Sequence, residues 1–295
     1  MESEYIFIMG AGRSGSKIYL NILNMSEDIE ILPELGYWTP WKFDIIDLMS
    51  KYSLFKNLNE IDYFLNDLSS RKIKSSYWNM VCKGEINFNK DEIKKLIKKK
   101  KLQKKDFLTI ILEYTKLKNN CKRVGAKFPL HVSKIDFLLK NFPKAKIIQI
   151  TRNPHPTIIS HSKKLIYKKE KNFFKNPIIY IKYYFFVLHG IVDYNWSSWI
   201  YFKNKKNNRY LIMKFEDIIT NPKENIQILC NFLNIEYNEI MLNPPAVDSS
   251  YKRNIKRGFD KNALTNWKKQ CNIFERIIIS ILTIPGKIFY AKCNE

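Results

Sequence analysis

The sequence predicts an α/β fold, in which helices flank a parallel sheet and one helical insertion interrupts the pattern. Short apolar segments alternate with segments whose apolar residues recur at helical spacing, as in a parallel sheet covered on both faces. A glycine-rich turn directly follows the first apolar segment. The chain has 295 residues, of which 45% are hydrophobic, so it can bury a substantial core and is neither disordered nor fibrous.

The first predicted strand, Tyr5–Met9, is uniformly apolar, as strands buried on both faces are. The glycine-rich turn spans residues 10–17, and a helix is predicted over 18–25. Further strands are predicted at residues 29–32, 124–128, 146–151 and 210–215, and further helices at 133–141, from 156 onward and at 222–233. We expect these elements to form one domain over residues 1–295.

Two segments depart from this alternation. Residues 43–120 are polar with helical spacing and carry one weak strand signal, near Val81, so we expect a helical insertion. Residues 248–269 form a basic, loop-rich segment that leads into a final helix.

Two apolar stretches are too short to span a membrane, which takes ~20 residues. The stretch 178–192 is interrupted by Lys182, and the stretch 277–284 is stopped by Pro285-Gly286. The acidic N-terminus also lacks the features of a signal peptide. We therefore expect a cytoplasmic protein, with peripheral contact to a membrane left open.

The chain carries 51 Lys and Arg against 28 Asp and Glu, a net charge of +23. This charge predicts polyanionic partners: phosphate-bearing cofactors, anionic glycans or membranes, or nucleic acid. The run Lys94–Lys105 is either a solvated helix face, which we favour, or a contact with an anionic glycan or membrane. Five widely spaced cysteines fit reduced thiols, and no metal-ligand cluster is recognisable, so we expect no metal.

The turn after the first strand predicts a phosphate site. Its sequence Gly10-Ala-Gly12-Arg13-Ser14-Gly15 matches the spacing GxGxxG between a strand and a helix, where backbone amides and the helix N-terminus can hold a phosphate. A nucleoside-triphosphatase loop is disfavoured, because Ser16-Lys17 stand in the reverse of the required order. A dinucleotide site of an NAD(P)- or FAD-binding oxidoreductase remains an alternative, with Glu34 as the ribose ligand.

The loop as a whole, Gly12 to Lys17, resembles the 5′-phosphosulfate loop of sulfotransferases that use 3′-phosphoadenosine 5′-phosphosulfate (PAPS). In that family a basic residue precedes Ser-Gly and two hydroxyl residues. Here Ser16 keeps the first hydroxyl and Lys17 replaces the second. The resemblance implies a P-loop-like sulfotransferase fold, PAPS as co-substrate and the bisphosphate PAP as product.

A second phosphate site is predicted after the strand 146–151. Arg152 follows that strand directly and can bind a phosphate through two parallel hydrogen bonds. Ser160 lies two helical turns further on. The stretch resembles the family's 3′-phosphate motif, with Asn153 in place of the usual aspartate. A dinucleotide fold does not need this second site, whereas PAPS carries phosphates at both positions.

Three more segments follow the family's order. Lys127 belongs to a block that resembles the family's Lys-x-Pro motif, and Phe215 to one that resembles Tyr-Glu-Asp. The basic segment with Lys256, Arg257 and Gly258 resembles the C-terminal loop that covers the nucleotide. The resemblance thus adds Phe215, Lys256, Arg257 and Gly258 to the predicted nucleotide site.

The predicted reaction moves a sulfuryl group from PAPS to an acceptor hydroxyl on a saccharide, a glycolipid or another molecule, and we expect the insertion over residues 43–120 to lie on the acceptor side. Glu34 is the expected general base, because it follows the second strand and relatives that act on glycans and tyrosine carry a glutamate there. Arg13 and Lys127 would stabilise charge on the transferred group. His161 is an alternative base, and a nucleic-acid-binding protein is the alternative from another class.

Overall fold

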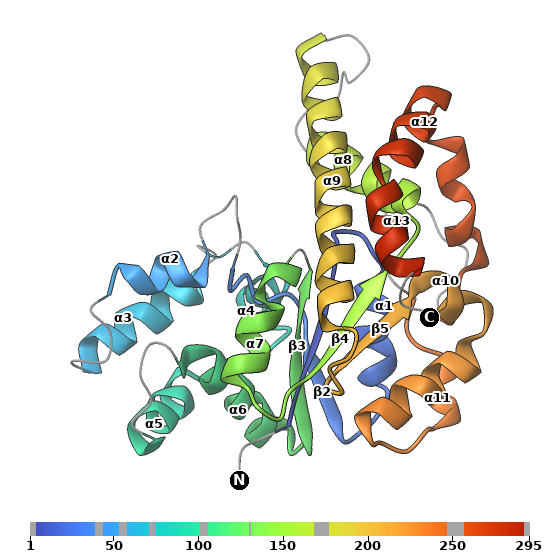
Figure 1. Cartoon of the computed structure of the whole chain (residues 1–295). Helices are drawn as coiled ribbons and strands as arrows, with labels where there is room; N and C mark the ends of the chain where they lie inside the picture. The colour runs from blue at the N-terminus through green and yellow to red at the C-terminus, as the bar shows by residue number, and fades with distance from the viewer. Residues whose placement is uncertain are drawn as a thin grey trace. The chain divides into compact units, whose positions relative to one another are not determined.

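The computed structural model describes residues 4–38, 44–52, 58–70, 73, 75–100, 106–129, 131–167, 177–246 and 257–291. Their centre is a five-stranded sheet in the order β2-β3-β1-β4-β5, which confirms the predicted α/β class (Figure 1). The pairs β2–β3 and β4–β5 are parallel. The strands are β1 Tyr5–Gly10, β2 Ile29–Leu32, β3 Arg123–Pro129, β4 Lys146–Thr151 and β5 Tyr210–Lys214.

The chain divides into two compact units. The first comprises Met1–Phe7 and Ser26–Phe128, and the second Ile8–Met25 and Pro129–Glu295. The first unit contains the predicted helical insertion, whose helices are α2 Ile45–Ser50, α3 Leu58–Leu68, α4 Ser76–Cys82, α5 Lys90–Lys100 and α6 Phe107–Asn119.

The strand signal near Val81 is wrong, because Val81 lies in α4. The oxygen of the Ser75 side chain accepts the amide hydrogen of Trp78 and caps this helix, and the adjacent side chains of Tyr77 and Trp78 are buried. The cap and the packing outweigh the strand preference of the local sequence.

The described part of the lysine run forms the outer face of α5. Lys95, Lys98 and Lys99 are exposed, whereas Ile93 and Leu96 are buried on the other face. Lys94 forms an ion pair with Asp62. Residues 101–105 of the run lie outside the described residues.

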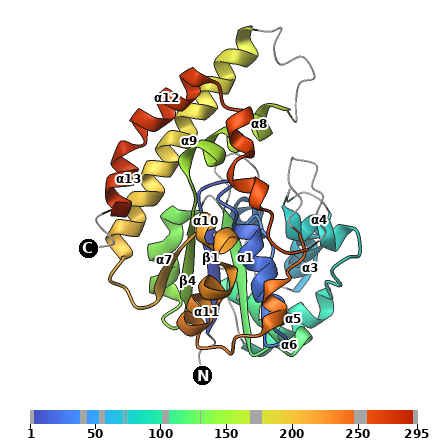
Figure 2. The same cartoon turned by 90° about the vertical axis from the view of Figure 1, so that its right-hand side faces the viewer.

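The second unit carries helices on both faces of its strands, with α1 Ser16–Leu23 and α7 Ile135–Asn141 on opposite faces (Figure 2). Its other helices are α8 Pro154–Tyr167, α9 Pro177–Asn204, α10 Phe215–Thr220, α11 Pro222–Leu233, α12 Ile273–Leu282 and α13 Ile284–Ala291. In the described ranges, no helix combines the length and the hydropathy that crossing a bilayer requires.

The predicted final helix is two helices. The helix is interrupted at Thr283, whose hydroxyl donates to the carbonyl of Ile279. Pro285 lies in the first turn of α13 and does not end a helix. Proline is tolerated there because the first amides of a helix have no partner within it. The side chain of Asn195 in α9 accepts the amide hydrogen of Gly286, which holds α13 against α9.

Candidate active site

The glycine-rich loop joins the end of β1 to α1 within the second unit. The amide of Ser14 donates to the carbonyl of Ala11 at 3.1 Å, and Arg13 has a left-handed φ of 69°. Gly15 is the residue before α1, also left-handed at φ 96°, and a Cβ there would lie 2.2 Å from Cδ2 of Phe215. Gly15 is therefore required both by its conformation and by the close approach of Phe215.

The loop presents donors suited to an anion. Ser14 is 1% exposed, and its hydroxyl has no hydrogen-bond partner among the described residues. The first turn of α1 contains no acidic residue, and its leading amides have no partner inside the helix. A buried hydroxyl beside a helix N-terminus is an arrangement that favours a phosphate or sulfate group.

The structure brings the two predicted phosphate motifs into direct contact. Nε of Arg13, in the loop, donates to Oγ of Ser160, in α8, at 3.0 Å. These residues are 147 positions apart in the sequence. Because Ser160 accepts from Arg13, its own hydroxyl hydrogen stays available for a further acceptor.

Three contacts hold the Arg152 guanidinium. Its Cζ lies 4.0 Å from the ring centroid of Phe215, Nη2 donates to the carbonyl of Ala263 at 2.7 Å, and Nη1 lies 3.4 Å from the carbonyl of Arg13. Phe215 is only 5% exposed. Its ring thus packs beneath both the loop at Gly15 and the guanidinium, and it can orient both.

The C-terminal segment reaches Arg152 through Ala263, a contact that the sequence did not suggest. Arg257, one of the predicted nucleotide ligands, instead donates through Nε to the carbonyl of Asn243 at 3.0 Å and lies beside Met25. The amide of Gly258 donates to the carbonyl of Pro244. Lys256 lies outside the described residues.

Asn153 directly precedes α8 and stands where the resembling motif carries aspartate. Its Oδ1 accepts the amide hydrogen of His155 at 3.0 Å, which caps the helix as an aspartate would. Its own amide donates to the carboxylate of Glu216 at 2.9 Å. Glu216 belongs to the block that resembles the Tyr-Glu-Asp motif, but the sequence did not indicate its partner, which lies 63 positions away.

Glu34 and Lys127 belong to the first unit, where they lie at the carboxyl ends of the paired strands β2 and β3. The carbonyl of Glu34 accepts from the amide of Tyr77 at 3.1 Å, and the carbonyl of Leu35 accepts from the indole of Trp78 at 2.9 Å. The start of α4 therefore fixes the backbone that carries Glu34. Lys127 is 9% exposed.

A buried histidine near the start of α8 predicts a pH-dependent stability. Burial lowers the pKa of His155, whose ring stacks on Trp267 with centroids 4.8 Å apart and whose Nε2 lies 3.1 Å from Oγ of Ser280. The unfolded chain binds a proton near pH ~6.5, whereas folded His155 resists protonation until a lower pH. The contribution of neutral His155 is therefore complete above about pH 6.5 and is lost as the pH falls below it.

We expect His155→Asn to weaken this dependence. The urea midpoint of the wild type should fall between pH ~7 and ~5, and that of the variant should fall less, because the group that takes up the proton is gone. An unchanged pH slope in His155→Asn would assign the dependence to other groups.

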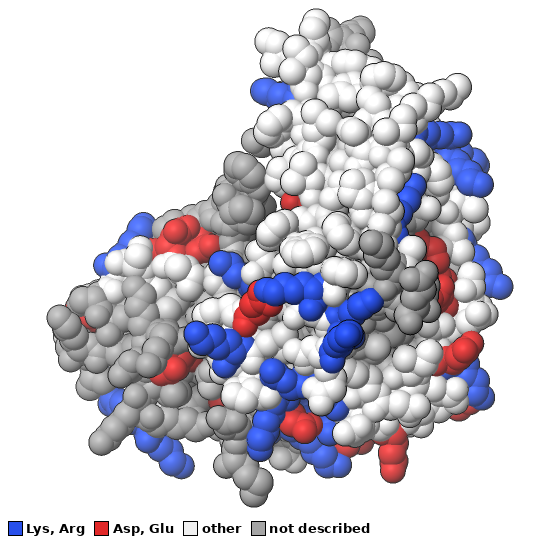
Figure 3. Space-filling view, viewed as in Figure 1, with Lys and Arg blue, Asp and Glu red and all other residues white. Residues whose placement is uncertain are grey.

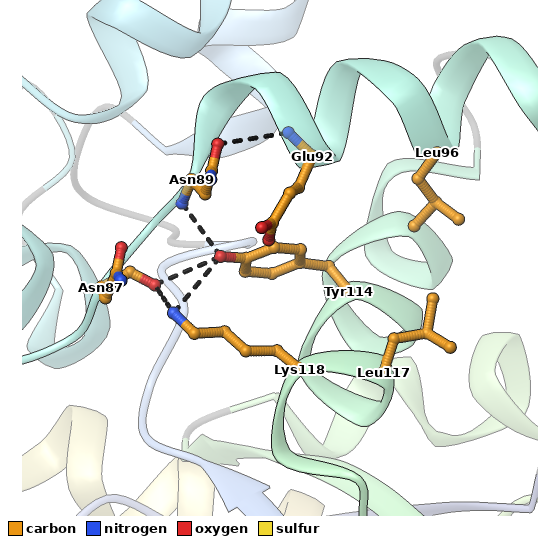
Figure 4. Close-up of a pocket in the computed structure, with 7 residues that line it drawn as sticks. All are labelled: Asn87, Asn89, Glu92, Leu96, Tyr114, Leu117 and Lys118. Carbon is orange, nitrogen blue, oxygen red and sulfur yellow. Dashed lines mark hydrogen bonds between the residues drawn. The ribbon is translucent and has the colours of Figure 1, made fainter.

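The first unit contains a pocket that none of the predicted site residues lines (Figure 4). The hydroxyl of Tyr114 accepts from the amide of Asn89 at 2.9 Å and donates to the carbonyl of Asn87 at 3.2 Å. Lys118 also donates to the carbonyl of Asn87. These polar groups bond to one another, and we assign the pocket no part in the reaction.

Comparison with known proteins agrees with this geometry. The model of the sulfotransferase family matches residues 5–239. The sulfotransferase domain from the curacin biosynthetic pathway is 16% identical over 99% of this chain and 98% of that domain, with a TM-score of 0.57. The sulfotransferase domain from the Synechococcus PCC 7002 olefin synthase is 17% identical over 98% of this chain and 96% of that domain, with a TM-score of 0.52. No curated protein sequence is similar enough to be matched.

The two structural neighbours share the fold at low identity, whereas the family model covers most of the chain in sequence. That match begins at the first residue of β1 and includes the glycine-rich loop, Arg152 and Ser160. The chain therefore belongs to the sulfotransferase family, enzymes that transfer a sulfuryl group from PAPS to an acceptor.

Proposed function

We propose that the protein transfers the sulfuryl group of PAPS to a hydroxyl of a saccharide or glycolipid, and that Gly12 to Lys17, Arg152 and Ser160 bind the nucleotide. The observation that carries this proposal is the hydrogen bond between Arg13 and Ser160. It joins the loop predicted to bind the 5′-phosphosulfate to the helix predicted to bind the 3′-phosphate. A site for a single phosphate would need only one of these two elements, the loop or the helix.

The proposed roles follow from hydrogen-bond capacity. The Ser14 hydroxyl and the first amides of α1 donate to the 5′-phosphosulfate, and Gly12 and Gly15 let the backbone approach it. Ser160 donates its hydroxyl hydrogen to the 3′-phosphate, and Arg152 binds the same group through the guanidinium that Phe215 and Ala263 orient.

The proposed reaction is an in-line displacement at sulfur. The acceptor oxygen forms a bond to sulfur while the bond from sulfur to the bridging phosphate oxygen breaks, and PAP leaves with that oxygen and its electron pair. Glu34 takes the proton of the acceptor hydroxyl, and Arg13 and Lys127 stabilise negative charge on the sulfuryl and bridging oxygens. The saccharide or glycolipid acceptor rests on the resemblance to glycan-directed relatives and on the basic charge of the chain.

Calorimetric titration with PAP tests the nucleotide site. We expect tight binding without added metal, and a loss of affinity of about 10- to 100-fold in Arg152→Ala, since a charge-assisted bidentate contact is worth about 1.5–3 kcal/mol. Arg209→Ala is the matched control, because Arg209 is another partly buried arginine of the second unit that donates to backbone carbonyls. Its PAP affinity should not change.

A parallel titration with NADPH tests the alternative of a dinucleotide-binding oxidoreductase. Binding of NADPH alone would identify the loop as a dinucleotide site and would overturn the roles of Arg152 and Ser160. A salt-sensitive gel shift with nucleic acid, without PAP binding, would favour the nucleic-acid-binding alternative.

A further inference from the structure

Seven large apolar side chains form an exposed stripe along α9. They recur every three or four residues, which places them on one face of the helix, and each is 40 to 69% exposed. The other face of α9 is buried in a cluster with residues of α8 and α12. The exposed residues are Ile178, Ile181, Phe185, Leu188, Val192, Trp196 and Trp199. An apolar stripe of this length on a surface helix indicates an interaction site.

A second stripe follows α12 and α13 at the same spacing. It consists of Ile273, Ile277, Ile281, Ile284 and Ile288, each 46 to 74% exposed. The helices that carry the two stripes pack side by side. The ring of Tyr184 lies 6.0 Å from that of Phe274, and the ring of Trp199 lies 5.5 Å from that of Phe289. Nδ2 of the Asn195 side chain donates to the carbonyl of Leu282 at 2.8 Å.

These stripes together make one broad surface, which we call the outer apolar surface. Figure 1 shows α9 beside α12 and α13, and Figure 3 shows the same region almost free of charged atoms, with blue Lys and Arg atoms along its margins. Three helices carry it, whereas the seam of a two-stranded coiled coil uses the a and d positions of one helix from each chain.

The exposed charges around this surface are of one sign. In the described residues of these three helices the acidic side chains are Asp193, which pairs with His189 at 3.3 Å, and Glu275, which is 4% exposed and accepts from Tyr183. The exposed charges there are basic, as at Lys182 and Lys287. A helix face of Ile, Phe and Trp bordered by lysine is typical of helices that lie in the surface of an anionic bilayer.

We propose that the outer apolar surface binds an anionic lipid bilayer, with its apolar side chains inserted below the headgroups and its lysines beside anionic lipids. A second copy of the chain is a poorer match. Each copy carries a net charge of +23, and the carboxylates of these helices, Asp193 and Glu275, are already paired with His189 and Tyr183. The proposal does not depend on the reaction proposed above.

Co-sedimentation of the full chain with lipid vesicles tests this proposal. We expect binding to vesicles of phosphatidylcholine with phosphatidylserine and weaker binding to phosphatidylcholine alone, with the difference reduced at high salt. The variant I181S/F185S/L188S should lower the partition coefficient at least about tenfold, because it removes three inserted side chains without adding charge. The control I228S/I240S removes two exposed apolar side chains from elsewhere in the second unit and should bind like the wild type.

Four results would overturn the proposal: no vesicle binding by the wild type, equal binding to both kinds of vesicle, equal loss in the control variant, or loss only when Lys95, Lys98 and Lys99 of α5 are replaced by glutamine. Sedimentation velocity without lipid adds a fifth. If the wild type is a dimer and I181S/F185S/L188S is a monomer, a second copy covers this surface. Melting curves of all variants should match the wild type, since every substituted residue is exposed.

Discussion

Glu34→Gln is expected to lower kcat about 10²- to 10⁴-fold while leaving the affinity for PAP unchanged, which is the usual contribution of a general base. Glutamine keeps the size of the side chain and removes its ability to accept a proton. The backbone at this position is held by contacts that do not involve the carboxylate, from the amide of Tyr77 to the carbonyl of Glu34 and from the indole of Trp78 to the carbonyl of Leu35. The loop should therefore keep its conformation.

The measurement is the release of PAP from PAPS with a panel of saccharide and glycolipid acceptors, beside a calorimetric titration with PAP. Glu30→Gln is the matched control, because Glu30 is a carboxylate of the adjoining strand β2 whose pKa burial raises. We expect Glu30→Gln to turn over like the wild type. If Glu34→Gln retains the wild-type kcat, another group takes the proton, and His161 is the next residue to replace.

Strand positions could be predicted closely because a buried strand has a local signature. The predicted ranges 29–32 and 146–151 are the observed bounds of β2 and β4. Both are short runs rich in β-branched residues, and the parallel sheet places their side chains against helices on both faces. The location of Arg152 follows from the end of β4, so the sequence could place this residue at an edge of the sheet.

The contacts that shape the candidate site could not be predicted in this way. Ala263 accepts from Arg152 through its backbone carbonyl. Every residue has such a carbonyl, so the sequence does not indicate which one Arg152 contacts. Trp78 anchors the segment of Glu34 from 43 positions away, and an aromatic residue at helical spacing indicates only a core position. The resemblance predicts Phe215 as a nucleotide contact, but it does not indicate that the buried ring also lies against the loop and the Arg152 guanidinium. Such contacts depend on tertiary packing between distant segments.

Gly15→Ala is expected to destabilise the protein by about 2–5 kcal/mol and to abolish measurable PAP binding. Two costs act together. A left-handed φ costs a residue with a Cβ about 1–2 kcal/mol, and the new Cβ would lie 2.2 Å from Cδ2 of Phe215, so the ring must move. The displaced ring would no longer stack under the Arg152 guanidinium, which lies 4.0 Å from its centroid. One methyl group is thus expected to disturb both predicted phosphate motifs.

Gly84→Ala separates the two costs, because Gly84 has a similar left-handed φ of 74° and nothing within 4 Å of an added Cβ. Its loss of stability in urea unfolding should equal the conformational cost alone, so the remaining loss in Gly15→Ala belongs to the collision with Phe215. The double variant Gly15→Ala/Phe215→Ala should then be more stable than the sum of the single losses predicts, since removing the ring also removes the collision. Strict additivity would mean that the loop shifts without pressing on Phe215, and the ring would lose its assigned role as the link between the loop and Arg152.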